Sequence, residues 1–283
     1  MKIRNIRAQT ITEAVARLCV EANYYLPADV IRALQKARRQ EISPLGKTSL
    51  QIILDNARIA KEENIPLCQD CGVAVVFLEI GQDVHVTGGN IYEAVNEGVR
   101  RGYREGYLRK SVVARPYSQR VNTQNNSPAV IHTDLVPGDH LRITIMPKGG
   151  GSENMTRLFM LNPGDNRQTV IDTVVKAVNE SGSNSCPPVV VGVGIGGTSE
   201  NAMLAAKKAT LRPIGTRNPV KEDAAMENEL LRQINNLGIG PEGFGGRITA
   251  LAVAVAAFPC HIATLPVAVS IQCHAVRRGE VIL

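Results

Sequence analysis

The hydrophobic periodicity of the chain changes near residue 65, and this change constrains the fold more than any other feature of the sequence. Before it, apolar residues such as Ile11, Val15 and Leu18 recur every three or four positions, which is typical of amphipathic helices. Beyond it, short apolar segments bounded by turn residues indicate strands that alternate with helices. We therefore predict a helical N-terminal lobe over residues 1–65 and a mixed α/β part over residues 66–283.

The predicted elements follow one another without an internal repeat, a low-complexity segment or a linker-like run. Helices are predicted at residues 10–40 (two helices), 49–64, 90–107, 169–181, 200–209 and 222–237. Strands are predicted at residues 73–79, 84–87, 129–135, 141–146, 189–193, 249–257 and 268–272. The simplest organisation is one compact domain over residues 1–283, of the mixed α/β (α+β) class, with the helical lobe packed on mixed β-sheets.

Composition and charge argue against several classes of protein. The formal charge is +6, but the basic residues are scattered and aromatic residues make up only 4%, so we expect a small anionic substrate rather than nucleic acid. The apolar run at residues 251–258 is too short to cross a bilayer, and the N-terminus lacks the apolar segment of a signal peptide. We therefore expect a cytoplasmic protein without a membrane partner, whose six cysteines are metal ligands or buried thiols rather than disulfides.

The pair Cys68-Gln69-Asp70-Cys71 lies just ahead of a predicted strand. A redox dithiol would open a helix, and half a zinc site would require a second Cys or His pair; the sequence offers neither context. We interpret the pair as one functional cysteine with an accidental neighbour. Gln69 and Asp70 are polar side chains suited to hydrogen bonding and proton transfer beside it.

Two glycine-rich segments follow predicted strands. Lys148-Gly-Gly-Gly-Ser-Glu-Asn154 exposes backbone N–H groups and allows close approach of a ligand, although it lacks the full P-loop pattern. Gly192-x-Gly-x-Gly-Gly-Thr198 is similar to a dinucleotide fingerprint, but its spacing differs from G-x-G-x-x-G and no acidic residue follows at the expected distance. A flexible connection remains the alternative for the first segment, and a nucleotide site remains an alternative for the second.

Cys68, Cys186 and Cys273 each lie at a predicted loop or strand end and are far apart in the sequence. Dispersed thiols of this kind are compatible with a cluster held between strand termini, and three thiolates on a [4Fe–4S] cluster leave one iron open. An open iron can act as a Lewis acid on a substrate hydroxyl or carboxylate. The spacing is compatible with this chemistry and does not by itself require it.

Four motifs together resemble the class I (iron–sulfur) fumarate hydratase and L-tartrate dehydratase family. They are Leu67-Cys-Gln-Asp-x-Gly72, Lys148-Gly-Gly-Gly-Ser-Glu-Asn154, Cys186-Pro-Pro with the glycine segment that follows it, and Gln272-Cys-His-Ala275. They occur in this order across nearly the whole chain. The resemblance implies an oxygen-sensitive [4Fe–4S] cluster with three cysteine ligands and one open iron. The implied ligands are Cys68, Cys186 and Cys273.

The resemblance also implies the residues that would contact a dicarboxylate substrate. Those expected to bind it are Gln69, Arg109, Gly149, Gly150 and Gly151. Asp70 and His261 are expected to be catalytic, with a satisfied core histidine as the alternative for His261. The family usually has Thr or Ser at the position of Cys71, which favours Cys71 as a non-ligand.

Single-chain members of this family carry a further C-terminal domain with a catalytic Thr, a Lys and more substrate arginines. The present chain stops where the first domain of the family ends, so we expect the α subunit of a two-subunit, α2β2 enzyme with a β subunit that carries the second catalytic domain. The expected reaction is hydration of fumarate to L-malate in the tricarboxylic acid cycle, with dehydration of tartrate to oxaloacetate as the alternative. A non-catalytic iron–sulfur or zinc redox sensor and a nucleotide-binding protein are alternatives from other classes.

Overall fold

The computed structural model describes residues 3–283, and its elements confirm the predicted mixed α/β class. Contacts between residues divide the chain into two compact units, each with its own four-stranded sheet. Unit 1 comprises the residues up to Leu26, Ala57–Gly150 and Arg277–Leu283. Unit 2 comprises Pro27–Asn56 and Gly151–Val276. The organisation as one domain over residues 1–283 stays a prediction.

Three helices occur within residues 8–63, as predicted, after a short strand that the periodicity did not indicate. The strand is β1 (Arg4–Arg7), and the helices are α1 (Ala8–Tyr24), α2 (Ala28–Gln40) and α3 (Pro44–Glu63). The predicted apolar face of α1 is confirmed, because Ile11, Val15 and Leu18 are all buried in the core of unit 1. Helix α1 belongs to unit 1 and α2 to unit 2, while α3 contributes residues to both. No helix within residues 3–283 is both long and apolar enough to cross a membrane.

The sheet of unit 1 has the strand order β10-β5-β2-β4. Its strands are β2 (Val73–Gly81), β4 (Val130–Val136), β5 (Leu141–Lys148) and β10 (Gly279–Ile282). Strand β2 is parallel to β4 and antiparallel to β5, and β10 is antiparallel to β5. The short β3 (Val84–Thr87) pairs in parallel with β1. Strand β10 was not predicted. It pairs with β5, so the C-terminal segment joins the same sheet as β2, the strand that follows the Cys68–Cys71 turn.

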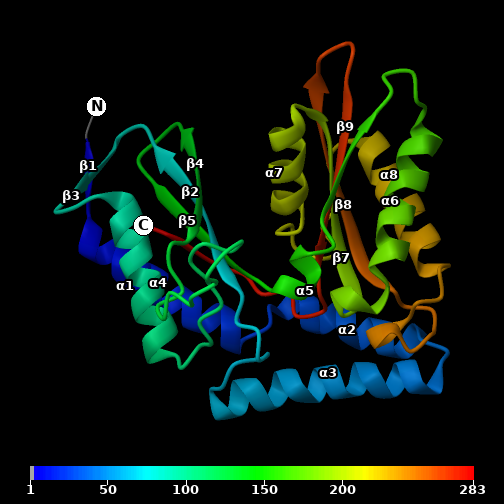
Figure 1. The fold of residues 1–283 in the computed structure, drawn as a ribbon, viewed down its shortest axis with the longest axis horizontal. Helices are drawn as coiled ribbons and strands as arrows, with labels where there is room; N and C mark the ends of the chain where they lie inside the picture. Colours follow the sequence, from blue (N-terminus) through cyan, green and yellow to red (C-terminus); the bar gives the residue numbers. More distant parts are fainter. Residues whose placement is uncertain (1–2) are drawn as a thin grey trace. The chain divides into compact units, whose positions relative to one another are not determined.

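Helix α4 (Ile91–Glu105) packs closely on α1 in unit 1, as Figure 1 shows. A Cβ at Gly98 would lie 2.6 Å from Cβ of Val15, and one at Gly102 would lie 2.6 Å from the carbonyl oxygen of Ala16. The two glycines are four positions apart and therefore share one face of the helix. Their missing side chains allow the two helix backbones to approach each other.

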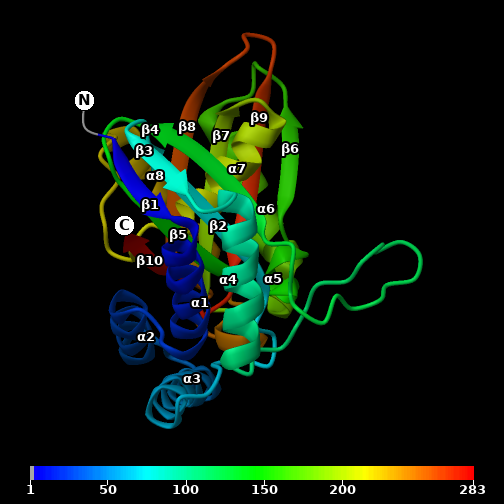
Figure 2. The same cartoon turned by 90° about the vertical axis from the view of Figure 1, so that its left-hand side faces the viewer.

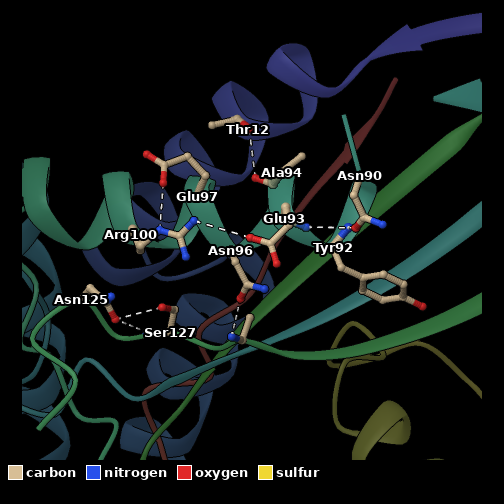
Figure 3. Close-up of polar contacts among 11 residues, drawn as sticks. Thr12, Asn90, Tyr92, Glu93, Ala94, Asn96, Glu97, Arg100, Asn125 and Ser127 are labelled. Carbon is tan, nitrogen blue, oxygen red and sulfur yellow. Dashed lines mark hydrogen bonds and ion pairs between the residues drawn. The ribbon is translucent and has the colours of Figure 1, made fainter. Parts of the chain in front are cut away.

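Polar contacts fix the N-terminal end of α4 (Figure 3). The Asn90 side chain accepts hydrogen bonds from the backbone N–H groups of Tyr92 and Glu93, which caps the helix. The Thr12 hydroxyl of α1 donates to the carbonyl oxygen of Ala94, and Asn96 accepts from the N–H that precedes β4. The cap and these bonds tie α4 to both α1 and the sheet.

The sheet of unit 2 has the strand order β6-β9-β7-β8. Its strands are β6 (Arg157–Leu161), β7 (Val189–Gly197), β8 (Ala250–Cys260) and β9 (Leu265–Gln272). Helices α6 (Arg167–Ser181) and α8 (Lys221–Asn235) pack on one face and α7 (Ser199–Ala209) on the other (Figure 1). The short helices are α5 (Gly150–Glu153), η1 (Gly182–Ser185) and η2 (Pro241–Gly243).

The glycine-rich segment before α7 has a packing role in this sheet. A Cβ at Gly192 would overlap the carbonyl oxygen of Ala206, and one at Gly194 would overlap that of Ala202. Alternate residues of a strand face the same side, so these glycines let α7 lie directly on β7. The alternation of glycines therefore follows from helix–strand packing and does not require a nucleotide.

A buried carboxylate holds together two distant segments of unit 2. Glu41, between α2 and α3, is 2% exposed and accepts backbone N–H groups of Ile42, Ser43, Arg247 and Ile248 at 2.7–2.9 Å. Burial by itself would raise the pKa of this carboxyl group, but the N–H donors outweigh it and the net pKa is lowered from its ordinary value of 4.5. The ionised form therefore stabilises the folded unit.

We expect Glu41→Gln to destabilise the chain by about 1–3 kcal/mol at neutral pH, because an amide cannot accept four N–H groups as a carboxylate does. A lowered pKa in the folded state adds stability above the unfolded pKa, and this stability is lost as pH falls through the folded pKa. The difference between wild type and variant should therefore shrink below about pH 4.5. Urea unfolding at several pH values measures it, with the exposed Glu63→Gln as control; equal stability of Glu41→Gln and wild type would contradict the expectation.

Candidate functional site

The turn that contains the Cys-x-x-Cys pair leads from α3 into β2 in unit 1. It places the two thiols in different environments, one partly exposed and one buried. Cys68 is partly exposed; its Sγ accepts the N–H of Asp70 at 3.4 Å, and its thiol donates to Gln69 Oε1 at 3.4 Å. Cys71 is buried, and burial raises the pKa of its thiol. The Tyr103 hydroxyl donates to the carbonyl oxygens of Cys71 and Gly72, which anchors the end of the turn. Cys68 is thus the accessible thiol of the pair.

Asp70 joins this turn to the glycine loop that follows β5. Its Oδ2 accepts the N–H of Gly150 at 2.7 Å, and its Oδ1 accepts the N–H of Gly72 at 2.9 Å. The Ser111 hydroxyl donates to Oδ1 at 3.4 Å. A Cβ at Gly149 would lie 3.2 Å from Oδ2, so the loop passes close to the carboxylate. Unit 1 therefore brings together two motifs that are 80 residues apart in the sequence.

Arg109 lies at the base of a long loop between α4 and β4, which Figure 2 shows running outward. Its backbone N–H donates to Sγ of Cys71 at 3.2 Å, which places its main chain against the Cys68–Cys71 turn. Its side chain is exposed and makes no ion pair among residues 3–283. The predicted residues Gln69, Asp70, Arg109, Gly149 and Gly150 therefore share one region of unit 1.

Cys186 and Cys273 lie on neighbouring segments of unit 2. Cys186 follows the η1 turn with a left-handed backbone (φ 52°) and is exposed, and Cys273 directly follows β9 and is partly exposed. The N–H of His274 donates to the carbonyl oxygen of Cys186 at 3.2 Å, and Nδ1 of His274 lies 2.8 Å from Oε1 of Glu242. Gly151 packs beside the same η1 turn, where its Cβ would lie 3.0 Å from the carbonyl oxygen of Asn184.

His261 is not brought to the two cysteines of unit 2. It lies in the exposed turn between β8 and β9, where Ala263 N–H donates to its Nδ1 at 3.1 Å. Cys273 follows the other end of β9, and an eight-residue strand spans roughly 26 Å at about 3.3 Å per residue. His261 is exposed, so it is not a core histidine, which was the alternative interpretation. Its catalytic role stays a prediction.

The donor chemistry of the six cysteines fits the predicted ligand set. Cys19 and Cys71 are buried, and burial raises the pKa of the Cys19 thiol to about 12, so neither readily forms a thiolate. Cys260 is the exposed last residue of β8, next to the turn that contains His261, and its thiol donates to the Thr264 carbonyl oxygen. The remaining three, Cys68, Cys186 and Cys273, are also exposed or partly exposed at turns and strand ends, and Cys273 lies at the other end of β9 from Cys260.

The described residues contain no group of three or more His, Cys, Asp and Glu side chains arranged to hold a metal ion. Cys68 belongs to unit 1, whereas Cys186 and Cys273 belong to unit 2. The predicted convergence of all three thiols therefore stays a prediction. A cavity of about 600 Å³ does occur in unit 2, beside α2, α8 and β8, but none of the predicted site residues lines it.

Two residues near Asp70 were not among the predicted site residues. Ser111 follows Arg109 closely in the sequence, but a lone serine in a loop carries no signal of its own. Arg277 donates to the carbonyl oxygen of Asp70 at 2.7 Å. It follows the Gln272-Cys-His-Ala275 motif by two residues, so the motif could have indicated it, although only the tertiary structure shows its contact.

Comparison with known proteins agrees with this arrangement of motifs. The model of the family described as fumarate hydratase (Fumerase) matches residues 12–282. This chain therefore belongs to the fumarate hydratase (Fumerase) family of hydro-lyases.

Relatives match it over nearly their whole lengths. A protein of Methanocaldococcus jannaschii, provisionally named L(+)-tartrate dehydratase subunit alpha, is 44% identical over 274 residues, which are 95% of this chain and 96% of the relative. The L(+)-tartrate dehydratase subunit alpha of Escherichia coli (strain K12) is 32% identical over 277 residues, with 96% and 90% covered. That of Escherichia coli (strain UTI89 / UPEC) is 33% identical over 273 residues, with 95% and 89% covered.

Proposed function

We propose that this chain is the α subunit of an iron–sulfur hydro-lyase that hydrates fumarate reversibly to L-malate. The observation that carries the proposal is the meeting of the Cys68–Asp70 turn, the Gly149-Gly150 loop and Arg109 in unit 1. An accessible thiol, an oriented carboxylate and an unpaired guanidinium lie in one region, as binding of an anionic substrate next to a metal would require. A cytoplasmic location and a place in the tricarboxylic acid cycle belong to the same proposal.

The residues that would hold a [4Fe–4S] cluster are Cys68, Cys186 and Cys273. When bound, a cluster with three thiolate ligands supplies a Lewis-acidic iron with an open position. Asp70 would move a proton at its carboxylate, which the N–H groups of Gly72 and Gly150 hold in one orientation. Because the Gly150 N–H already donates to Asp70, we assign Gly150 to orienting the carboxylate beside the substrate.

The polar groups around Asp70 would bind the two ends of the dicarboxylate. Arg109 can donate two parallel hydrogen bonds to one carboxylate, and the Gln69 amide can donate to the other or to the hydroxyl group. Gly149 and Gly151 would leave space for the substrate beside the loop. His261 would have to act across a boundary with another subunit, since it lies away from Cys273 in its own unit.

A β subunit that carries the second catalytic domain completes this proposal, as an α2β2 enzyme. It is supported by the names of the relatives, each called a subunit alpha. The same names favour a second candidate reaction, the dehydration of L(+)-tartrate to oxaloacetate. The two candidates require the same region, because both substrates are four-carbon dicarboxylates that lose or gain water.

The experiment that decides between them uses the chain together with a β subunit, reconstituted anaerobically. Fumarate formation from L-malate and oxaloacetate formation from L(+)-tartrate are measured on the same preparation. A larger kcat/KM for L-malate and fumarate supports the first candidate, and a larger one for tartrate replaces it with the second. A preparation that carries the cluster and converts neither substrate would reject both.

Arg109→Lys is expected to raise KM for the dicarboxylate about 10- to 100-fold with a smaller effect on kcat. Lysine keeps the charge but loses the two-pronged hydrogen bond, and a hydrogen bond to a charged group is worth about 1.5–3 kcal/mol. Steady-state kinetics of the reconstituted enzyme measure the change. Arg104→Lys, on the exposed surface of α4, is the control, and wild-type kinetics for Arg109→Lys would remove Arg109 from the site.

A further inference from the structure

Arg277 is a buried cation in the part of unit 1 that holds Asp70. Its side chain is among the largest of the fully buried ones, with 2% exposure. Its Nη1 donates to Oδ1 of Asn23 in α1 at 2.9 Å and to the carbonyl oxygen of Asp70 at 2.7 Å. Asn23 is itself fully buried and donates to the Cys19 carbonyl oxygen. Arg277 thus connects α1 with the turn that carries Cys68 and Asp70.

The charge of this guanidinium is not paired within the described chain. Arg277 forms no ion pair with any carboxylate of residues 3–283, and its buried Nε has no hydrogen-bond partner there. A buried charge with only neutral bonded partners is costly, and buried polar groups are normally satisfied. A neutral residue could fill the same volume without this penalty, so the positive charge itself needs an explanation.

The Nη2 side of the guanidinium faces the glycine loop. A Cβ at Gly149 would lie 3.4 Å from Nη2 of Arg277 and 3.2 Å from Oδ2 of Asp70. The Asp70 carboxylate and the guanidinium therefore flank Gly149 from two directions without forming an ion pair. Arg277 binds the main chain of Asp70, which leaves the carboxylate oxygens to the N–H groups of Gly72 and Gly150.

We propose that Arg277 is a positioning residue that holds the Asp70 turn in place and keeps an unneutralised positive charge beneath it for a dicarboxylate. The inference rests on the proposed function, because the dicarboxylate is the anion that the charge attracts. Arg277 itself stays buried and does not touch the ligand. Its two effects are separable: one is geometric, through the Asp70 carbonyl oxygen, and the other is electrostatic, through the unpaired charge.

Arg277→Lys tests the geometric effect. Nη1 alone makes both bonds, and the lysine nitrogen lies one atom closer to the main chain, so it cannot reach Asn23 and the Asp70 carbonyl oxygen together. The amides that Asp70 accepts should therefore lose protection. Hydrogen exchange of peptides that contain Gly72 and Gly150 should become faster, and kcat/KM should fall about 10- to 100-fold, the usual range for residues that orient a metal or catalytic site. The control is Arg142→Lys, an exposed arginine of β5 in the same unit, which is already paired with Glu79 and Glu280.

Asn23→Asp tests the electrostatic effect. The new carboxylate keeps an acceptor for Arg277 but neutralises its charge. We expect unchanged protection of the Gly72 and Gly150 amides and an unchanged kcat, while KM and the inhibition constant of succinate, an unreactive dicarboxylate, rise about tenfold. An arginine that is merely structural would leave the inhibition constant at its wild-type value.

Either of two results would overturn the inference: wild-type exchange and kinetics in Arg277→Lys, or wild-type succinate inhibition in Asn23→Asp. If Asn23→Asp fails to fold, because a carboxylate cannot donate to the Cys19 carbonyl oxygen as Asn23 does, the exchange and kinetics of Arg277→Lys decide. If the wild-type α and β subunits together show no hydro-lyase activity, the proposed function fails. Hydrogen exchange of Arg277→Lys in the full chain then still decides the positioning role.

Discussion

The chain reconstituted anaerobically with iron and sulfide, but without a β subunit, is expected to interconvert fumarate and L-malate about 10²- to 10⁴-fold more slowly than the two-subunit enzyme. Asp70, Arg109 and the predicted cluster ligands are present, but the family resemblance assigns the catalytic Thr and Lys to the second domain. Hydration of a double bond requires a proton donor at the carbon opposite the hydroxyl, and a positioned acid or base contributes about this factor.

Addition of the β subunit to the same preparation should restore the rate, which separates a missing catalytic group from a damaged cluster. The absorbance of the cluster, recorded before and after the addition, is the control. Full activity of the chain by itself, at a purity that excludes a contaminating hydratase, would contradict the split site.

Substitution of any one predicted ligand is expected to remove most of the bound iron and the broad visible absorption of the reconstituted chain. Cys68→Ser, Cys186→Ser and Cys273→Ser each take away one of three thiolates, and loss of a ligand cannot be compensated by the buried thiols. Iron content per chain and the absorbance spectrum under anaerobic conditions measure the effect.

The matched controls are the other three cysteines, and Cys19→Ala, Cys71→Ala and Cys260→Ala should keep nearly normal iron content. The structure gives two reasons: Cys19 and Cys71 are buried, and Cys260 ends β8, at the other end of β9 from Cys273. Normal iron in Cys186→Ser or loss of iron in Cys71→Ala would change the ligand assignment. Zinc without iron would instead favour the redox-sensor alternative, and neither metal would favour a nucleotide-binding protein.

The sequence by itself was sufficient for features that depend on near neighbours. The periodicity of Ile11, Val15 and Leu18 predicted the buried face of α1, because residues three and four apart lie on one side of a helix. Strands β2, β5, β7, β8 and β9 were also predicted from local sequence, since their apolar runs are long and bounded by turn residues. The strands that it missed, β1, β6 and β10, are four or five residues long and give a weak local pattern, although the equally short β3 was predicted.

In the candidate site, too, the sequence identified local motifs but not the contacts between distant residues. The turn at Cys68 and the loop at Gly149 could be recognised as motifs, and their chemistry follows from the residue types. The sequence could also be read as a nucleotide site at Gly192 and Gly194, whereas the structure shows that these glycines make room for α7. Local sequence cannot distinguish a glycine that admits a ligand from one that admits a helix, because both require only a missing side chain.

Residue identity and local periodicity therefore determined the fold class, most of the elements and the candidate thiols. Only the tertiary structure decided that Asp70 accepts the N–H of Gly150, 80 residues away, and that Arg277 bonds to Asn23 across 254 residues. It also decided that Cys71 is buried and that His261 lies at the far end of β9 from Cys273. Such contacts depend on which strands pair and which helices pack on them, and that choice is made by burial of the whole core rather than by neighbouring residues.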